Sequence, residues 1–317
     1  MKAIILAGGF ATRLWPLTEK KAKPLLLLKN KELVTHIVES IPENIEIIIS
    51  TNKIFEKDFL NWKEKRFKNR KNIEIFIEDS KNDKGKKGAL GALSLIIQEK
   101  NIKEDFMVLA GDNYFGFDFK KFIDSYENNP ILAVYDVKDL EKAKQFGIVI
   151  SKNGKTVDEF QEKPENPKST LASTGAYIFP AKVAKDIIEY AEKKNDDLGG
   201  IFEHLKQKNQ TINIFSFNEY WFDIGSFQGY LDSHKSIQKE SIFYDESCKI
   251  KNSELKGAVS ISENCEIEDS ILENVILFPG IKIKNCEIRN AIIDENCIIE
   301  NIDISYKIIR ANSVLVR

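Results

Sequence analysis

The chain repeats itself after about residue 247. Three segments have nearly the same sequence: NCEIEDSIL (264–272), NCEIRNAII (285–293) and NCIIEN (296–301). Across this part an isoleucine or leucine returns about every five or six residues, and the spacing typical of a helix is absent. A short period of this kind predicts stacked structural repeats, in which each repeat buries its apolar residues against its neighbours.

The repeat is similar to the hexapeptide repeat of a left-handed parallel β-helix, in which the apolar residue of each hexad points inward. The glycine that usually stands next to that residue is mostly missing here. We expect residues 247–317 to form such a β-helix after a linker over 239–246. Because β-helices expose flat faces and open coil ends, we expect this part to mediate homo-oligomer formation and to be dispensable for catalysis.

The first 238 residues alternate strand-like and helix-like segments, which predicts a Rossmann-like α/β domain over 1–238. Its sheet should be mainly parallel, with helices on both sides. The predicted strands are 2–7, 45–50, 73–77, 105–110, 131–137 and 211–217, and the clearest helical patterns are 32–41, 88–100 and 181–194. Ligands of such sheets bind at the carboxyl ends of the strands, so the loops that follow strands are the candidate site.

Composition excludes several classes of function. The 317 residues include 47 basic and 49 acidic side chains, a balance that argues against binding to nucleic acid or to an anionic membrane. The sequence has no apolar run long enough to span a membrane, and the apolar run at the N-terminus is too short for a signal peptide. We therefore expect a cytoplasmic protein with four reduced cysteines. His36, His204 and His234 lie far apart, which disfavours a histidine metal site or a Ser–His triad.

The strongest motif is LAGGFATRLWPLTEKKAKPLLLL (6–28). A buried strand opens into Gly8 and Gly9, which allow backbone N–H groups to approach a ligand closely. Arg13 and Lys23 add positive charge, so the motif suits a polyphosphate. It is neither a Walker A loop nor the Rossmann G-x-G-x-x-G pattern.

This stretch resembles the signature of the sugar-phosphate nucleotidyltransferases, roughly LAGGxGTRLxPLTxxxxKPLLP. Further family-like motifs follow in the expected order: KGALGAL (87–93), AGDNYFGFD (110–118), QFGIV (145–149), EKP (162–164), STGAYIF (173–179) and WFDIGS (221–226). The resemblance covers residues 1 to about 235, and an added β-helix is common in the family. Ala11 replaces a glycine of the signature and Leu27 replaces a proline. Alanine adopts a positive φ less readily than glycine, so the phosphate contacts of the loop are open to change.

The resemblance implies that a sugar-1-phosphate oxygen attacks the α-phosphorus of a nucleoside triphosphate and that pyrophosphate leaves. The implied catalytic residues are Arg13 for the β- and γ-phosphates, Lys23 for the α-phosphate, Asp112, and Lys163 for the sugar phosphate. The nucleotide would contact Leu6, Ala7, Gly8, Gly9, Arg13, Lys23, Gly88 and Asp112. The sugar phosphate would contact Gly147, Glu162, Lys163, Thr174 and Gly175. Asp112 and Asp223 would hold Mg²⁺, which prefers oxygen ligands.

Simpler interpretations stay open for single residues. Asp112 could cap a helix that starts near Asn113, and Asp223 or, better, Ser226 could cap the next helix. Lys163 could be a solvated charge, Trp221 is interpreted as a packing residue, and the cysteines as buried β-helix residues. The lysine-rich segment 81–87 is interpreted as a solvated loop.

Three other functions agree less well with the sequence. A non-catalytic regulatory or scaffold homologue should have lost some of Arg13, Lys23, Asp112, Lys163 and Asp223, and all five are present. A choline-phosphate or cofactor-phosphate acceptor is disfavoured by the EKP and STGAY motifs. A β-helix acyltransferase would need a histidine base, and no histidine follows His234. Thymidine or uridine triphosphate with glucose-1-phosphate is the first expectation, and guanosine triphosphate with mannose-1-phosphate the second.

Overall fold

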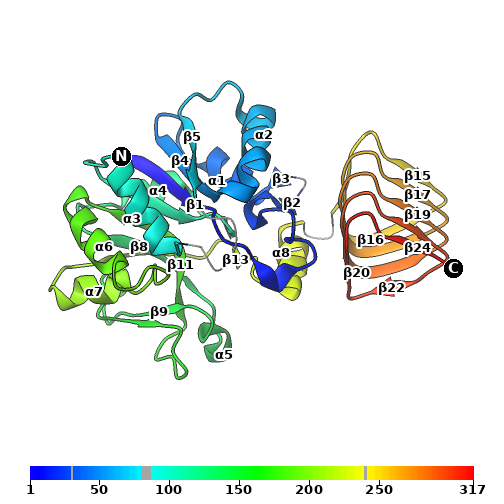
Figure 1. Ribbon diagram of the computed structural model, residues 1–317. Helices are drawn as coiled ribbons and strands as arrows, with labels where there is room; N and C mark the ends of the chain where they lie inside the picture. Colours follow the sequence, from blue (N-terminus) through cyan, green and yellow to red (C-terminus); the bar gives the residue numbers. More distant parts are fainter. Residues whose placement is uncertain (30, 80–86, 239–240) are drawn as a thin grey trace. The chain divides into compact units, whose positions relative to one another are not determined.

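The computed structural model describes residues 1–29, 31–79, 87–238 and 241–317, and the chain forms two compact units (Figure 1). Unit 1 comprises Met1–Phe10 and Val34–Asp223. Unit 2 comprises Ala11–Leu33 and Ile224–Arg317. The segment 11–33, which carries Arg13 and Lys23, therefore belongs to the same unit as the C-terminal repeats. This division differs from the expected division of the chain at residue 238.

Unit 1 is built on a nine-stranded sheet whose main path has the order β10-β9-β11-β6-β1-β4-β5, with β8 pairing with β11 and β12. The strands are β1 (Lys2–Leu6), β4 (Glu46–Asn52), β5 (Ile73–Glu78), β6 (Phe106–Ala110), β8 (Ile131–Asp136), β9 (Gly147–Ile150), β10 (Glu159–Glu162), β11 (Leu171–Phe179) and β12 (Asn213–Phe217). Strands β6, β1, β4 and β5 run parallel, and β11, β9 and β10 add an antiparallel part.

The helices of the α/β part are α1 (Leu33–Ser40), α2 (Glu56–Phe67), α3 (Ala89–Glu99), α4 (Phe119–Asp124), α5 (Leu140–Ala143), α6 (Ala184–Ala191) and α7 (Ile201–Gln207). Strand β1 lies in the middle of the sheet, and its residues Ala3, Ile4 and Ile5 are fully buried, as the apolar run predicts. The main core joins these strands to the apolar stripes of α3, α6 and α7. The predicted strands and helices are present, and the Rossmann-like fold class is confirmed.

Unit 2 contains α8 (Phe227–Gln238) and two stacked parallel sheets (Figure 1). The strands of the first sheet are β14 (Ile242–Tyr244), β16 (Glu254–Ile261), β18 (Ile271–Leu277), β20 (Glu287–Ile293), β22 (Ile304–Ser305) and β23 (Ile308–Ile309). The strands of the second are β15 (Lys249–Lys251), β17 (Glu266–Glu268), β19 (Lys282–Lys284), β21 (Ile298–Glu300) and β24 (Val314–Val316). Isoleucines of successive coils stand in register, as in Ile267 with Ile283, which confirms the β-helix.

Two details of the β-helix differ from the sequence-based expectation. Strand β14 pairs with β16, so the coil begins inside the segment 239–246 that was expected to be a linker. Most of the left-handed positions of the coil are occupied by asparagine rather than glycine. Eight asparagines of this part have positive φ: Asn252, Asn264, Asn274, Asn285, Asn290, Asn296, Asn301 and Asn312. Asparagine tolerates the left-handed conformation better than other residues with a side chain, so it serves at these positions.

Three of the four cysteines are buried in the coil and Cys248 is half-buried. All four are free thiols, as expected. Within the described ranges, the chain contains no helix with the length and apolar character needed to cross a membrane.

Candidate active site

The carboxyl ends of four parallel strands meet at one edge of the unit 1 sheet. Gly8 follows β1, Asn52 ends β4, Glu78 ends β5 and Asp112 follows β6. Strand register brings the first three together, because Leu6 lies opposite Ser50 and Asn52 lies opposite Glu78. The structure thus places the glycine loop and the first predicted aspartate at the edge where such sheets bind ligands.

Gly8 is fixed by two residues that the sequence motifs did not single out. The Asn52 side-chain amide donates a hydrogen bond to the Gly8 carbonyl oxygen. A Cβ atom at Gly8 would lie 2.7 Å from Glu78 Oε1, so a larger residue there would require this carboxylate to move. A Cβ at Gly9 would meet no atom of the described residues within 4 Å, so their packing does not require that glycine.

Glu78 is a buried carboxylic acid, only 3% exposed. The Ser50 hydroxyl donates a hydrogen bond to its Oε1 atom. Burial raises the pKa of Glu78 above its ordinary value, while this hydrogen bond and the charge of Lys87 act in the opposite direction. A buried carboxyl group with a raised pKa at the ligand-binding edge is typical of a functional site.

The two predicted metal ligands are brought together by a small antiparallel ribbon. Strands β7 (Asn113–Phe115) and β13 (Trp221–Asp223) pair so that Asp223 lies opposite Asn113, the residue after Asp112. The Asn113 side-chain oxygen is buried and has no hydrogen-bond partner among the residues that the structure describes. Carboxylate and amide oxygens are ligands of the kind that Mg²⁺ prefers, so the residue types at this ribbon fit that ion. Among the described residues there is no group of three or more His, Cys, Asp or Glu that could hold a metal, but Mg²⁺ commonly takes only one or two protein ligands.

The helix-cap interpretations are now decided. Asp112 precedes a strand, so the alternative interpretation of Asp112 as a helix cap is excluded. The Ser226 hydroxyl accepts a hydrogen bond of 3.1 Å from the Gly229 N–H at the start of α8. Ser226 is therefore the cap, as the better of the two alternatives. Trp221 is buried and its ring lies 5.0 Å from that of Phe146, which confirms a packing role.

A second cluster surrounds Glu162 at the end of β10. Glu162 lies opposite Gly147 of β9, and a Cβ at Gly147 would come within 3.0 Å of Glu162 Oε2. A Cβ at Gly199 would come within 2.5 Å of the same atom. Burial raises the pKa of Glu162, and the charge of Lys163 partly opposes this shift. Two glycines thus leave room around a single carboxylate.

Thr174 and Gly175 form a bulge in β11. The Thr174 hydroxyl donates a hydrogen bond of 2.9 Å to the Ala133 carbonyl oxygen. Gly175 has φ +79°, and a Cβ there would lie 2.7 Å from that of Ala110, at the end of β6. The register of β11 with β8 shifts at this point. Since its hydroxyl is already bonded to β8, Thr174 has a clear structural role in shaping the bulge.

Lys163 follows Glu162 in a left-handed conformation, with φ 41°. Its backbone N–H donates to the Phe146 carbonyl oxygen at 3.1 Å, and its Nζ lies 3.7 Å from Glu162 Oε1. The side chain is 67% exposed, so the ammonium group is available to a ligand. A left-handed residue before a proline is unfavourable, and strain of this kind concentrates at functional sites.

Gly88 stands before α3 and contacts a loop that the sequence motifs missed. A Cβ at Gly88 would lie 2.4 Å from the Asn195 carbonyl oxygen. The Gly91 N–H donates a hydrogen bond of 2.8 Å to the Asn195 carbonyl oxygen. The Ala89 N–H donates one of 3.2 Å to Asp196 Oδ1. Residues 195–199 therefore contact both Gly88 and Glu162. The predicted solvated loop 81–87 lies, except for Lys87, outside the described residues.

Arg13 and Lys23 lie on the segment 11–33 of unit 2. Arg13 is exposed in a 3-10 turn, and Lys23 begins the next turn with only 5% exposure. Ala11, which replaces the glycine of the signature, is left-handed with φ 45° and ψ 43°. The Thr18 hydroxyl donates a hydrogen bond of 2.7 Å to the Ala11 carbonyl oxygen, which closes the turn around Arg13.

Comparison with known proteins agrees with this combination of an α/β domain and a β-helix. The sequence model of the nucleotidyl transferase family matches residues 2–240, so the chain belongs to this family. The model of the GlmU-like C-terminal hexapeptide region matches residues 232–306.

Several curated proteins are similar over most of the chain. The bifunctional protein GlmU of Methanococcus aeolicus is 33% identical over 273 residues, which cover 84% of this chain and 62% of that protein. The chain thus spans about three fifths of the length of this relative. The glucose-1-phosphate adenylyltransferase of Lachnospira eligens is 28% identical. The match covers 95% of this chain and 74% of that protein.

A crystal structure from Bacillus anthracis, assigned as a glucose-1-phosphate thymidylyltransferase and obtained with sucrose, superposes with a TM-score of 0.66. It is 24% identical, and the match covers 77% of this chain and 97% of that one. This likeness supports the fold.

Proposed function

We propose that this protein transfers a nucleotidyl group from a nucleoside triphosphate to a sugar-1-phosphate. A phosphate oxygen of the sugar-1-phosphate forms a bond to the α-phosphorus, the bond from that phosphorus to the β-phosphate oxygen breaks, and pyrophosphate leaves. The observation that supports this proposal is the pairing of β7 with β13, in which Asp223 lies opposite Asn113, the residue after Asp112.

The roles of the residues are those that the family resemblance implies, and the charges of the residues fit them. Arg13, with its exposed guanidinium group, binds the β- and γ-phosphates and neutralises the leaving pyrophosphate. Lys23 neutralises the α-phosphate, and Lys163 holds the phosphate of the sugar. Glu162, whose carboxylate packs against Gly147 and Gly199, accepts hydrogen bonds from sugar hydroxyls. Such reactions depend on positioning and charge neutralisation rather than on covalent catalysis.

Asp112 and Asp223 are the residues that would hold Mg²⁺. When bound, this ion supplies Lewis-acid polarisation of phosphate oxygens and offsets the repulsion between the carboxylates and the substrate. Asn113 contributes by orienting Asp112, since its amide nitrogen lies 3.4 Å from Asp112 Oδ1.

Glucose-1-phosphate is the first candidate for the sugar substrate, because a curated relative over nearly the whole chain is a glucose-1-phosphate adenylyltransferase. Thymidine or uridine triphosphate is our first choice of nucleotide. Adenosine triphosphate is a further candidate, because this relative is an adenylyltransferase. Guanosine triphosphate with mannose-1-phosphate is the alternative.

The test is a matrix of pyrophosphate release. Each common nucleoside triphosphate is combined with glucose-1-phosphate, mannose-1-phosphate, galactose-1-phosphate and N-acetylglucosamine-1-phosphate, with Mg²⁺ present. One pair should exceed the others in kcat/KM by at least about tenfold, a factor that corresponds to about 1.4 kcal/mol. Release that does not depend on any sugar phosphate, or no release with any pair, would overturn the proposal.

A further inference from the structure

Two ion pairs join the segment 11–33 to the β-helix inside unit 2. Glu19 Oε2 lies 2.9 Å from Arg310 Nη1, and Lys21 Nζ lies 3.3 Å from Asp294 Oδ1. On the β-helix, Asp294 directly follows β20 and Arg310 directly follows β23. The segment that carries Arg13 and Lys23 is therefore bound to the coil by charged contacts at two places.

The contact of Lys21 is the better defined of the two, because its partners are buried. The Asp294 side chain is 8% exposed, and its Oδ1 atom also accepts a hydrogen bond of 2.9 Å from the Glu295 N–H. The Lys21 ammonium group also lies 4.3 Å from the ring centroid of Phe278, which is only 1% exposed. A lysine held by a buried carboxylate and an aromatic face has little freedom to move, and removal of one partner leaves a buried charge without compensation.

A third contact reaches the same segment through α8. The Tyr230 hydroxyl, on a fully buried side chain, donates a hydrogen bond to the Leu27 carbonyl oxygen. Burial, together with the nearby Asp294 charge, raises the pKa of Tyr230, so it remains a donor. Helix α8 is itself bonded to the coil, since Lys235 Nζ donates to Asn290 Oδ1 at 2.8 Å.

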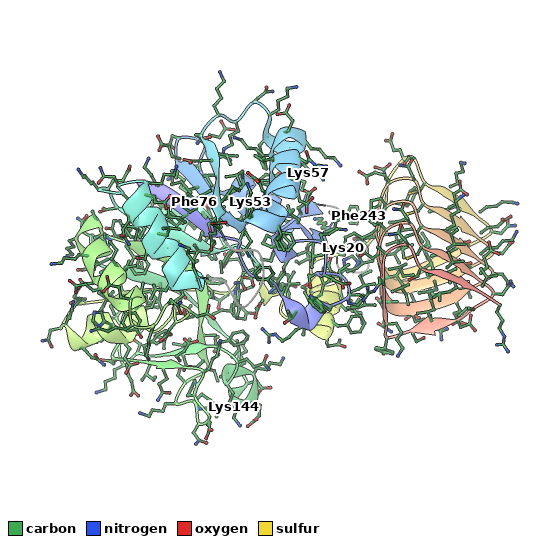
Figure 2. The ribbon with its side chains drawn as sticks, in the orientation of Figure 1. Lys20, Lys53, Lys57, Phe76, Lys144 and Phe243 are labelled. Carbon is green, nitrogen blue, oxygen red and sulfur yellow. The ribbon has the colours of Figure 1, made fainter. Side chains whose placement is uncertain are left out.

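A fourth contact lies at the start of the coil. Lys29 Nζ lies 5.9 Å from the ring centroid of Phe243, a residue of β14 that is labelled in Figure 2. Glu19, Lys21 and Lys29 of the segment thus contact the coil, and Leu27 contacts α8, so the contacts are spread along the segment.

These contacts flank the two cationic residues of the proposed phosphate site. Glu19 and Lys21 stand between Arg13 and Lys23 in the sequence, and Lys21 is two residues from Lys23. We propose that the β-helix positions Arg13 and Lys23, and that Lys21 is the main positioning residue through its contacts with Asp294 and Phe278. This inference rests on the proposed function and contradicts the expectation that residues 247–317 are dispensable for catalysis.

The kinetic test uses the full chain with Lys21→Gln and Asp294→Asn. Either change should lower kcat about tenfold and raise the KM for the triphosphate, with the KM for the sugar phosphate within twofold of wild type. The matched control is Glu266→Gln, which breaks exposed ion pairs of the same coil to Lys249 and Lys282 and should leave all three constants within twofold. Unchanged constants in folded Lys21→Gln and Asp294→Asn would overturn the proposal.

A double variant tests whether Lys21 and Asp294 act as one contact. Lys21→Gln/Asp294→Asn should be no slower than the slower single variant, because each single change already removes the contact. Independent, multiplied losses would overturn the pairing. If Asp294→Asn does not fold, Phe278→Leu replaces it, since this change removes the aromatic face without leaving a buried charge.

Hydrogen–deuterium exchange gives a readout that does not depend on activity. Peptides covering residues 11–29 should exchange at least about tenfold faster in Lys21→Gln than in wild type or Glu266→Gln. Equal exchange would overturn the positioning role. If wild type transfers no nucleotidyl group to any sugar phosphate, the proposed function fails while the exchange result still reports on the contact.

Discussion

Replacing Ala11 by glycine should stabilise the protein. Ala11 has φ 45° and ψ 43°, a left-handed conformation that costs an alanine about 1–2 kcal/mol. Glycine adopts it without this cost, but the greater freedom of glycine in the unfolded chain takes back about 0.4–1 kcal/mol. At the midpoints of these two ranges, the net gain in the free energy of unfolding is about 0.8 kcal/mol. The bond from the Thr18 hydroxyl to the Ala11 carbonyl oxygen involves only the backbone of residue 11, so it is retained.

The assay is urea unfolding at pH 7 combined with the thermal midpoint, which should rise by about 1–4 °C. Ala22→Gly is the matched control in the same segment. Ala22 is extended, with φ −63°, and fully buried, so the same substitution there should lower the stability. A loss of stability in Ala11→Gly, or changes of the same sign in both variants, would refute the reasoning.

Three further predictions concern the site. Asp112→Asn, and equally Asp223→Asn, should keep the fold and lower kcat by about a hundredfold or more, and excess chelator should abolish turnover of wild type; near-normal kcat in the double variant would reject the metal assignment. Lys163→Ala should raise the KM for the sugar phosphate about 30-fold or more with the triphosphate KM nearly unchanged, whereas equal weakening of both would reassign the residue. The pKa of Glu78 is raised in the folded protein. Above pH 4.5, the ordinary pKa of a glutamate, the unfolded chain loses the Glu78 proton while the folded protein still retains it. Its stabilising effect is therefore present at low pH and is lost as the pH rises through the folded pKa, and Glu78→Gln should flatten this decline in urea midpoints measured from pH 4.5 to 8.

Much of the fold could be predicted because its strongest signals are local. The apolar run of β1 and the stripe of α3 give the central strand and a covering helix directly. The repeats after residue 247 give the β-helix, since each coil has the same requirement for an inward isoleucine. The antiparallel strands β9, β10 and β11 were missed as strands. β9 and β10 have only four residues each, and the pairing of β9 with β10 and β11 is not a local signal.

The candidate site was predicted less completely. Gly8 and Asp112 stand in motifs next to strong strands, so their position at the sheet edge followed from the sequence. Asn52 and Glu78 end strands too, and their place in parallel register was the signal that could have identified them. The loop at 195–199 carries no periodic pattern, and its approach to Gly88 and Glu162 arises only from the packing of the folded chain.

Left-handed residues with side chains link the local and the long-range parts of this structure. Ala11 and Lys163 both adopt positive φ values, which no local preference of alanine or lysine favours. Such conformations persist only where surrounding contacts determine them. For Ala11 these contacts are the Thr18 hydroxyl within the turn and, further along the same segment, the Lys21–Asp294 pair on the β-helix. A sequence signature can therefore keep its left-handed turn after losing a glycine, provided that a second part of the chain holds the segment in place.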